Sequence, residues 1–405
     1  MSIKVWTDTH PAGMLAARGP RGSVFAYLPE ARDAQTVSLT MPVRLESWNM
    51  DFGLAPIFEM NLPEGALRER LRLAFAKATG RFEDLDLLAI VGRSQIGRLR
   101  YTGADEALDQ AVPFQSIDEI LNSRRDGGLY AYLIERFAPH SGVSGVQPKL
   151  LVRDEQAVAL SAAFDRSSLK GATHIVKFWE SDYPQLAANE YFCLRAAQRC
   201  GLSVPRFRLS DDGRALVIDR FDLRADGGYL GFEDFCVLNA RPTAQKYRGS
   251  YETAIMKRFR DFASADSVVE GSECLFTLIA LNCALRNGDA HLKNFGVIYD
   301  EIQGRVALAP VYDIVTTTAY LPADTMALTL EGSTKWPDAR RLMNFAVNRQ
   351  IGGPAAIRAI MQKVATAIAD TIPEVEAYAR GRPEFAEIAV RMIDAWRDGI
   401  ETSLG

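Results

Sequence analysis

The sequence predicts an α+β fold with a β-rich first half and a mostly helical second half. Short strand-like runs separated by turns recur in residues 1–221, whereas residues 222–405 carry apolar residues at helical spacing. The length of 405 residues favours two or three domains. Hydrophobic residues make up 48% and charged residues 24%, a globular composition that excludes a largely disordered chain.

Residues 1–105 predict a small mixed subdomain. A helix is expected over 65–78, where apolar residues recur every three or four positions, and Gly80 marks its end. The other elements expected here are strands 24–28, 37–41 and 97–101 and a helix over 82–91. The polar stretch that follows the last strand sets the boundary at residue 105.

Residues 106–221 predict a second, strand-rich domain. The loop 140–148 leads into its first strand, and a helix over 186–200 ends at Gly201. The strands expected in this domain are 149–152, 157–160, 173–178, 206–209 and 215–221.

Residues 222–405 predict a helical domain. A long apolar helix over 272–285 is followed by the loop 286–294. A hairpin with strands 295–299 and 306–312 comes next, and the chain then shows the amphipathic spacing of packed helices.

The charge and the rare residue types exclude several function classes. A net charge of −4 excludes a strongly basic nucleic-acid coat. Five cysteines without a C-x-x-C pair, and only four histidines, argue against a zinc cluster. We expect a soluble, cytosolic protein, because no apolar leader or bilayer-length apolar stretch occurs.

The most informative motif is a D-x-x-x-x-N formed by Asp289 and Asn294, followed after the hairpin by Asp313. Phosphoryl transfer from ATP needs a carboxylate that accepts the proton of the acceptor hydroxyl. It also needs an amide oxygen and a second carboxylate that hold Mg²⁺. Asp289 fits the first role, Asn294 and Asp313 fit the second, and Lys293 can neutralise the phosphate. The alternative is a capped helix end with two turn aspartates. The order of Asp289, Asn294 and Asp313 behind a long apolar helix favours a catalytic site for phosphoryl transfer.

A second group of residues fits the nucleotide. Lys177 closes an apolar strand and can hold the α- and β-phosphates, with Glu190 in the next helix as its ion-pair partner. The loop 142–147 has two glycines, which let backbone N–H groups approach a phosphate. The strand end 219–222 can present backbone groups to adenine, with Phe221 packing nearby. The alternatives are a solvated lysine, a plain turn and a strand end with a core phenylalanine.

Together these residues resemble the HipA family of serine/threonine kinases, the toxin half of HipA/HipB-type toxin–antitoxin modules. The motifs that carry the resemblance are residues 61–64, 90–93, 144–149, 173–177, 189–191, 219–222, 287–294 and 310–313. The likeness covers nearly the whole chain and implies a bilobal, protein-kinase-like α+β fold. It assigns 1–105 to an N-terminal accessory subdomain, 106–221 to a β-rich nucleotide-binding lobe and 222–405 to a helical catalytic lobe.

The resemblance also implies the roles of individual residues. Asp289 is implied as the catalytic base, Asn294 and Asp313 as the Mg²⁺ ligands, and Lys177 as the lysine that holds the ATP phosphates. The other residues implied on the ATP side are Ser144, Gly145, Val146, Gln147, Pro148, Lys149, Asp219, Arg220, Phe221, His291, Leu292, Lys293 and Tyr312. The implied cofactors are therefore ATP and Mg²⁺.

Regulation and partners follow from the same resemblance. In this family a serine of the phosphate loop can be autophosphorylated, which ejects the loop and switches the kinase off. The position used in some members is Gly142 here, so Ser144, or as an alternative Ser141, is the expected site. Family substrates are aminoacyl-tRNA synthetases. The usual partner is a HipB-like helix-turn-helix antitoxin, through which the toxin reaches operator DNA.

Two other functions stay open. A small-molecule kinase of the aminoglycoside or choline type shares the Asp and Asn five residues apart and the later Asp. The N-terminal β-rich subdomain and residues 144–149 argue against it. A catalytically silent corepressor would act only through the antitoxin, and the presence of Asp289, Asn294, Asp313 and Lys177 argues against that.

Overall fold

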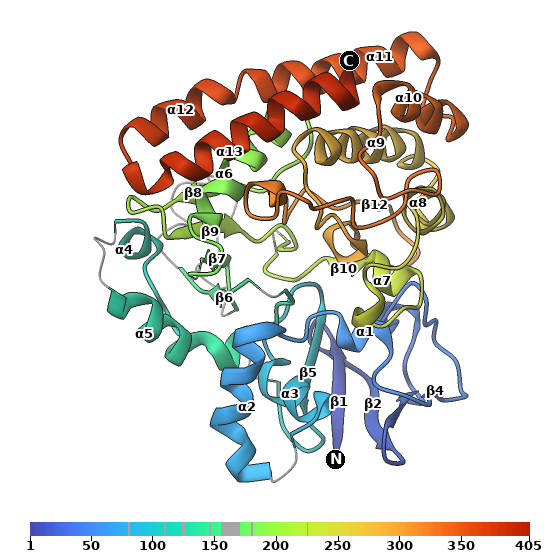
Figure 1. The fold of residues 1–405 in the computed structure, drawn as a ribbon. Helices are drawn as coiled ribbons and strands as arrows, with labels where there is room; N and C mark the ends of the chain where they lie inside the picture. Colours follow the sequence, from blue (N-terminus) through green and yellow to red (C-terminus); the bar gives the residue numbers. More distant parts are fainter. Residues whose placement is uncertain are drawn as a thin grey trace. The chain divides into compact units, whose positions relative to one another are not determined.

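Figure 1 shows the computed structural model, which describes residues 1–79, 82–108, 111–122, 127–145, 147–154, 171–179, 181–224 and 226–405. The chain forms two compact units. Unit 1 comprises Met1–Phe178, Phe207–Thr243 and Ile298–Gly304, and unit 2 comprises Trp179–Arg206, Ala244–Val297 and Arg305–Gly405. The expected strand 157–160 lies outside the described residues, and the domain boundaries at 105 and 221 stay predictions.

The first sheet of unit 1 is antiparallel, with the strand order β4-β3-β2-β1-β5. Its strands are β1 (Ser2–Thr7), β2 (His10–Arg18), β3 (Gly22–Tyr27), β4 (Trp48–Met50) and β5 (Leu99–Gly103). Ile3 and Val5 of β1 are fully buried while their neighbours are less so, as expected for a sheet with one core-facing side.

Unit 1 also contains helices, of which α4 and α5 contact strands of its second sheet. They are α1 (Pro56–Glu59), α2 (Gly65–Thr79), α3 (Asp84–Val91), α4 (Ile117–Leu121), α5 (Gly127–Phe137) and α7 (Phe235–Leu238). The helices predicted over 65–78 and 82–91 are therefore confirmed as α2 and α3. α3 packs against β1 and β5 and buries four apolar side chains, among them Leu87 and Leu88.

The second sheet of unit 1 carries the strands of the predicted nucleotide-binding region. Its order is β6-β7-β9-β8, and all its pairs are antiparallel. Its strands are β6 (Lys149–Val152), β7 (His174–Phe178), β8 (Phe207–Leu209) and β9 (Ala215–Asp219). In this register Lys149 of β6 lies directly opposite Lys177 of β7.

The strand predicted over 37–41 is wrong. The backbone turns there, with Met41 N–H donating to the Ser38 carbonyl at 3.0 Å. The Ser38 hydroxyl and Leu39 N–H donate instead to the buried Glu233 carboxylate, at 2.8 and 2.7 Å, so these polar groups are satisfied without a neighbouring strand. Strands β1, β2, β4 and β10 (Gly231–Asp234) are absent from the sequence prediction.

Helices dominate unit 2 (Figure 1). Its α-helices are α6 (Leu186–Arg199), α8 (Arg258–Phe262), α9 (Val268–Ala284), α10 (Ala339–Asn348), α11 (Pro354–Ala369), α12 (Ile372–Arg380) and α13 (Pro383–Gly399). Helix α9 is buried along most of its length and packs against α8, α11 and α13. The helices predicted over 186–200 and 272–285 are confirmed as α6 and α9.

The catalytic motif predicted from the sequence follows α9. The loop 286–294 leads into β11 (Gly296–Tyr299), and β12 (Val306–Leu308) precedes Asp313. The second hairpin strand, predicted to reach residue 312, ends at Leu308, where Ala309 N–H still donates to the Gly296 carbonyl before Pro310. Across the described residues, none of the helices combines the length and the apolar character that crossing a bilayer requires.

Candidate active site

The loop that carries Asp289 is anchored to the end of α9. The Asn287 side-chain amide donates to Asn282 Oδ1 on α9 at 2.7 Å. The Asn287 side-chain oxygen in turn accepts from the Asp289 backbone N–H at 3.1 Å. Gly288 fits between this loop and Asp324, because a Cβ at Gly288 would overlap the Asp324 carboxylate. The loop around Asp289 is thus held by the hydrogen bonds of Asn287 and by the close packing of Gly288 against Asp324.

The Asp289 carboxylate is half exposed and already accepts one hydrogen bond. Its side chain is 49% exposed, and the Tyr247 hydroxyl donates to Oδ1 at 2.6 Å. Partial burial raises the pKa of Asp289, and the hydrogen bond from Tyr247 opposes that rise. A carboxylate with a raised pKa and an accessible oxygen has the properties of a general base.

Asn294 and Asp313 lie side by side in unit 2. The Asn294 Nδ2 donates to the Asp313 carbonyl at 3.2 Å, and the Tyr312 hydroxyl donates to the Lys293 carbonyl at 3.0 Å. Asp313 has a φ of +51°, an uncommon conformation that aspartate tolerates better than most residues. The predicted metal residues are therefore brought together by contacts between the loop 286–294 and the segment after β12.

The Asn294 side chain has the properties of a metal ligand. Asn294 is only 8% exposed, and within the described residues its Oδ1 accepts no hydrogen bond. Because Nδ2 is fixed by Asp313, the amide cannot turn to satisfy Oδ1 without losing that bond. A buried carbonyl oxygen with no donor is costly unless a ligand completes it, and Mg²⁺ takes oxygen ligands of this kind.

The segment that carries Asp313 is fixed from two helices. Asn189 of α6 forms two hydrogen bonds with the Thr316 backbone. Its Oδ1 accepts from the Thr316 N–H at 2.8 Å, and its Nδ2 donates to the Thr316 carbonyl at 3.1 Å. The indole N–H of Trp396 on α13 donates to the Thr316 hydroxyl at 2.7 Å. These contacts hold the strained Asp313 conformation in place.

His291 is buried and uncharged. Burial, together with the positive charges of Lys246 and Lys293, lowers the pKa of its imidazole to about 3. Its Nε2 is 3.9 Å from Asp289 Oδ1, too far for a strong hydrogen bond. We therefore expect His291 to shape the loop as a neutral ring.

These pKa shifts predict the pH dependence of phosphoryl transfer. A general base must be ionised, so the rate is expected to fall as the pH drops through the raised pKa of Asp289. This acid limb lies at a higher pH than for an ordinary aspartate. A His291→Asn variant is expected to keep the limb in place, because the imidazole is already neutral above about pH 3. The measurement is the pH profile of the phosphorylation rate. If the acid limb disappears in His291→Asn, His291 is the titrating group.

In unit 1, two lysines lie on one face of the second sheet. Lys149 and Lys177 are directly opposite each other on antiparallel strands, and they are 5% and 3% exposed. Gly145 has a φ of +120°, and a Cβ there would overlap the Lys149 ammonium group. Adjacent buried cations with a glycine against them form a surface suited to phosphate groups.

A Gly145→Ala variant is expected to bind ATP at least about 10-fold more weakly. The new methyl group would displace Lys149, and alanine strains the backbone at this φ, which costs on the order of 1–2 kcal/mol. Isothermal titration with ATP·Mg²⁺ measures the effect. Gly353→Ala is the control, because its φ is negative and no atom lies within 4 Å of its new Cβ. Equal affinity for ATP in the two variants would mean that Gly145 does not contribute to phosphate binding.

Ser144 lies beside this surface. Its hydroxyl donates to Glu64 Oε1 at 2.5 Å. Gln147 donates from its side-chain amide to the Phe178 carbonyl at 3.1 Å, and the Phe178 N–H donates to the Pro148 carbonyl at 2.8 Å. Ser144, Gly145, Gln147, Pro148, Lys149 and Lys177 are thus brought together, while Val146 lies outside the described residues.

The residues 219–222, predicted to face adenine, include a buried ion pair in unit 1. The Arg220 guanidinium binds both oxygens of Asp222, at 2.9 and 2.5 Å, and both side chains are fully buried. Arg220 also donates to the carbonyls of Gln95 and Ala172. His174 Nε2 lies 3.3 Å from Asp219 Oδ1. The Arg220 side chain therefore stabilises the region, and β9 ends at Asp219 rather than at residue 221.

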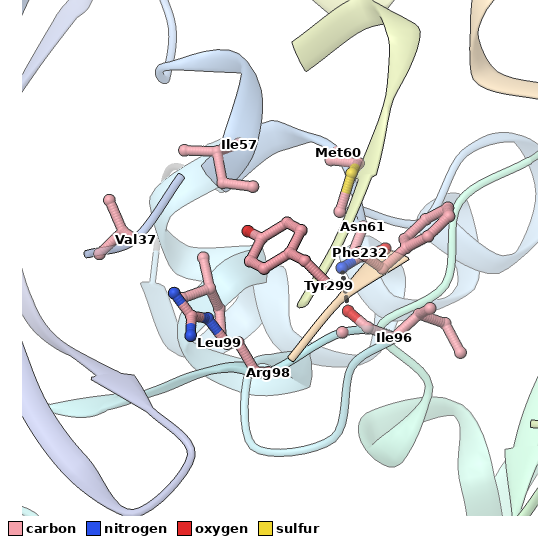
Figure 2. Close-up of a pocket in the computed structure, with 10 residues that line it drawn as sticks. Val37, Ile57, Met60, Asn61, Ile96, Arg98, Leu99, Phe232 and Tyr299 are labelled. Carbon is pink, nitrogen blue, oxygen red and sulfur yellow. Dashed lines mark hydrogen bonds between the residues drawn. The ribbon is translucent and has the colours of Figure 1, made fainter. Parts of the chain in front are cut away.

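Phe221 packs edge-on against Phe232, with ring centroids 5.4 Å apart. Phe232 also lines a cavity of about 10 Å³ in unit 1, and Figure 2 shows side chains that line it, including Arg98 and Tyr299. It has the size of about one water molecule. Asn61 donates to the Ile96 carbonyl at its wall (Figure 2). The cavity belongs to the packing of unit 1 and holds none of the predicted site residues.

Sequence reasoning missed two residues that lie against the catalytic loop. Tyr247 bonds Asp289, and Asp324 accepts from the Thr317 hydroxyl at 2.5 Å next to Gly288. Neither is near Asp289 in sequence, so no local spacing could have found them. The expected ion pair between Lys177 and Glu190 joins residues of different units and stays a prediction.

Comparisons with known proteins identify the family and the fold. The family model of the HipA N-terminal domain matches residues 3–102, and that of the HipA-like C-terminal domain matches 141–372. Two curated relatives, both from Sinorhizobium fredii, are named "Putative kinase Y4mE" and "Putative kinase Y4dM". Each is 28% identical, and the aligned parts cover 89% and 76% of this chain and 89% and 75% of theirs.

A solved structure has the same fold. The Shewanella oneidensis MR-1 HipA, from a complex with HipB and operator DNA, matches with a TM-score of 0.63 and 18% sequence identity. The match covers 98% of this chain and 99% of the other. The predicted α+β, kinase-like fold is thereby confirmed, and so is the resemblance on which it was based.

Proposed function

Since this chain belongs to the HipA family, we propose that it is an ATP-dependent serine/threonine protein kinase and the toxin of a toxin–antitoxin pair. One observation carries the proposal. Asp289, Asn294 and Asp313 are joined by hydrogen bonds: the His291 N–H donates to the Asp289 carbonyl at 2.7 Å and the Asn294 N–H to the His291 carbonyl at 3.0 Å, while Asn294 Nδ2 donates to the Asp313 carbonyl. Their side chains carry the oxygen groups that phosphoryl transfer requires.

In the proposed reaction Asp289 orients the acceptor serine and takes its proton. The serine oxygen forms a bond to the γ-phosphorus, and the bond from that phosphorus to the bridging oxygen breaks, which releases ADP. Lys293, which is 9% exposed, neutralises charge on the moving phosphoryl group. We propose further that Lys149 and Lys177 hold the remaining phosphates and that backbone groups of residues 219–221 bind adenine.

Asn294 Oδ1 and the Asp313 carboxylate would hold Mg²⁺. The metal, when bound, neutralises the negative charge that the phosphates carry in the transition state. The role of this chain is to keep the two ligands close. It does so through the hydrogen bond from Asn294 Nδ2 to the Asp313 carbonyl.

The proposed partners follow from the family. The similar Shewanella protein was solved with HipB and operator DNA, which supports a HipB-like antitoxin here and an indirect contact with DNA. We propose an aminoacyl-tRNA synthetase as the protein substrate, whose phosphorylation would inhibit translation and growth. Ser144 is the proposed autophosphorylation site, and its hydroxyl is held by Glu64.

The test is transfer of labelled γ-phosphate. Purified protein and an Asp289→Asn variant are incubated with γ-labelled ATP, Mg²⁺ and cell extract. Label on a protein band that is lost in the variant supports the proposal. Label on small molecules only would assign the aminoglycoside- or choline-type activity, and no turnover would assign the silent corepressor.

A further inference from the structure

We propose that Tyr247 is a positioning residue for the catalytic base: its hydroxyl holds Oδ1 of Asp289, so that Oδ2 receives the acceptor hydroxyl. The inference rests on the proposed kinase function. The phenol oxygen of Tyr247 is 2.6 Å from Oδ1, the distance of a good hydrogen bond between hydroxyl and carboxylate. With Oδ1 bound to Tyr247, the carboxylate offers only Oδ2 to the substrate hydroxyl.

Tyr247 is itself held against the catalytic loop. The Lys246 carbonyl, next to it in the chain, accepts from the Leu292 N–H at 3.1 Å. The Tyr247 ring packs edge-on against the His291 ring, with centroids 4.9 Å apart. The phenol is therefore fixed through its backbone and through its ring, although the residue is 51% exposed. An exposed tyrosine with this many contacts to one loop is suited to positioning that loop.

The charges around Asp289 give the contact a measurable consequence. Asp313 and Asp324 disfavour its ionised form, Lys246 and Tyr247 favour it, and His291 is neutral. Removing the Tyr247 hydroxyl deletes a bond made to the carboxylate. The acid limb of the rate should then move to higher pH, because the proton is bound more tightly.

The experiment compares Tyr247→Phe with the wild-type protein and with Tyr183→Phe. Tyr183 is a similarly exposed tyrosine of unit 2, and its ring contacts Tyr320. We expect Tyr247→Phe to lower kcat about 10-fold, as the loss of one hydrogen bond to a charged group does, while the KM for ATP changes by less than about twofold. Its acid limb moves to higher pH, and Tyr183→Phe behaves as wild type.

A second readout does not depend on catalysis. The protein is labelled with ¹³C at the aspartate carboxyl groups, and the Asp289 signal is identified by its loss in Asp289→Asn. We expect Asp289 to titrate at higher pH in Tyr247→Phe than in the wild type. If the wild type transfers no phosphate, the kinase proposal fails, and this titration still decides whether Tyr247 controls the carboxylate.

Two results would overturn the inference. In a folded Tyr247→Phe variant, an unchanged titration of Asp289 would mean that the hydroxyl does not bind the carboxylate. A higher kcat with an unchanged acid limb would mean that Tyr247 blocks the base instead of positioning it.

Discussion

Replacing Asp289 by Asn is expected to lower kcat for protein phosphorylation by about 10²–10⁴-fold, the usual contribution of a positioned general base. The amide cannot accept the serine proton, yet it retains the shape of the carboxylate and a carbonyl oxygen that the Tyr247 hydroxyl can still reach. Steady-state kinetics with ATP·Mg²⁺ and the protein acceptor measure the effect. The affinity for ATP should remain within about twofold of wild type, because the binding groups are elsewhere.

Asp266→Asn is the matched control for this prediction. Asp266 is an exposed aspartate of unit 2 whose ion pair with Arg305 lies at the surface. The control should retain wild-type kcat. Full activity in Asp289→Asn would assign the base to another group, and a loss of ATP affinity equal to the loss of kcat would make Asp289 a binding residue.

Replacing Arg220 by Ala is expected to lower the free energy of unfolding by about 3–5 kcal/mol, the usual cost of breaking a buried ion pair from one side. The substitution leaves the fully buried Asp222 carboxylate without its cation. It also removes the donors to the Gln95 and Ala172 carbonyls. The Gly97 N–H would remain as a donor to Asp222, at 2.6 Å, but it carries no charge.

Urea unfolding followed by circular dichroism measures this change. Arg208→Ala is the control, because Arg208 is 44% exposed and its ion pair with Asp118 spans 3.7 Å. A surface pair of this kind contributes less than about 1 kcal/mol. If Arg220→Ala unfolds at the same urea concentration as Arg208→Ala, the buried pair does not stabilise unit 1 as argued.

The sequence was sufficient for features that depend on local spacing. The helix α9, the loop after it and the order of Asp289, Asn294 and Asp313 are encoded within a short stretch of chain. The structure then adds that Asn294 and Asp313 are joined by a hydrogen bond. The helical periodicity of α2 and α3 was readable for the same reason.

Features that depend on distant partners could not be predicted. Tyr247 is 42 residues from Asp289, and only the folded chain brings its hydroxyl to the carboxylate. The apolar alternation of residues 37–41 predicts a strand. The chain turns there instead, because the Ser38 hydroxyl and the Leu39 N–H donate to Glu233, 195 residues from Ser38. Arg220 was assigned to the adenine side by its motif, whereas its side chain is used in the buried pair with Asp222.

The most direct test of the account is identification of the phosphorylated residue. Cell extract treated with ATP, Mg²⁺ and either the wild-type protein or Asp289→Asn is digested and analysed by mass spectrometry. The account predicts a new phosphoserine in a target protein with the wild type and none with the variant. A phosphoserine formed equally by both proteins, or by neither, would contradict the claim that this chain transfers phosphate through Asp289.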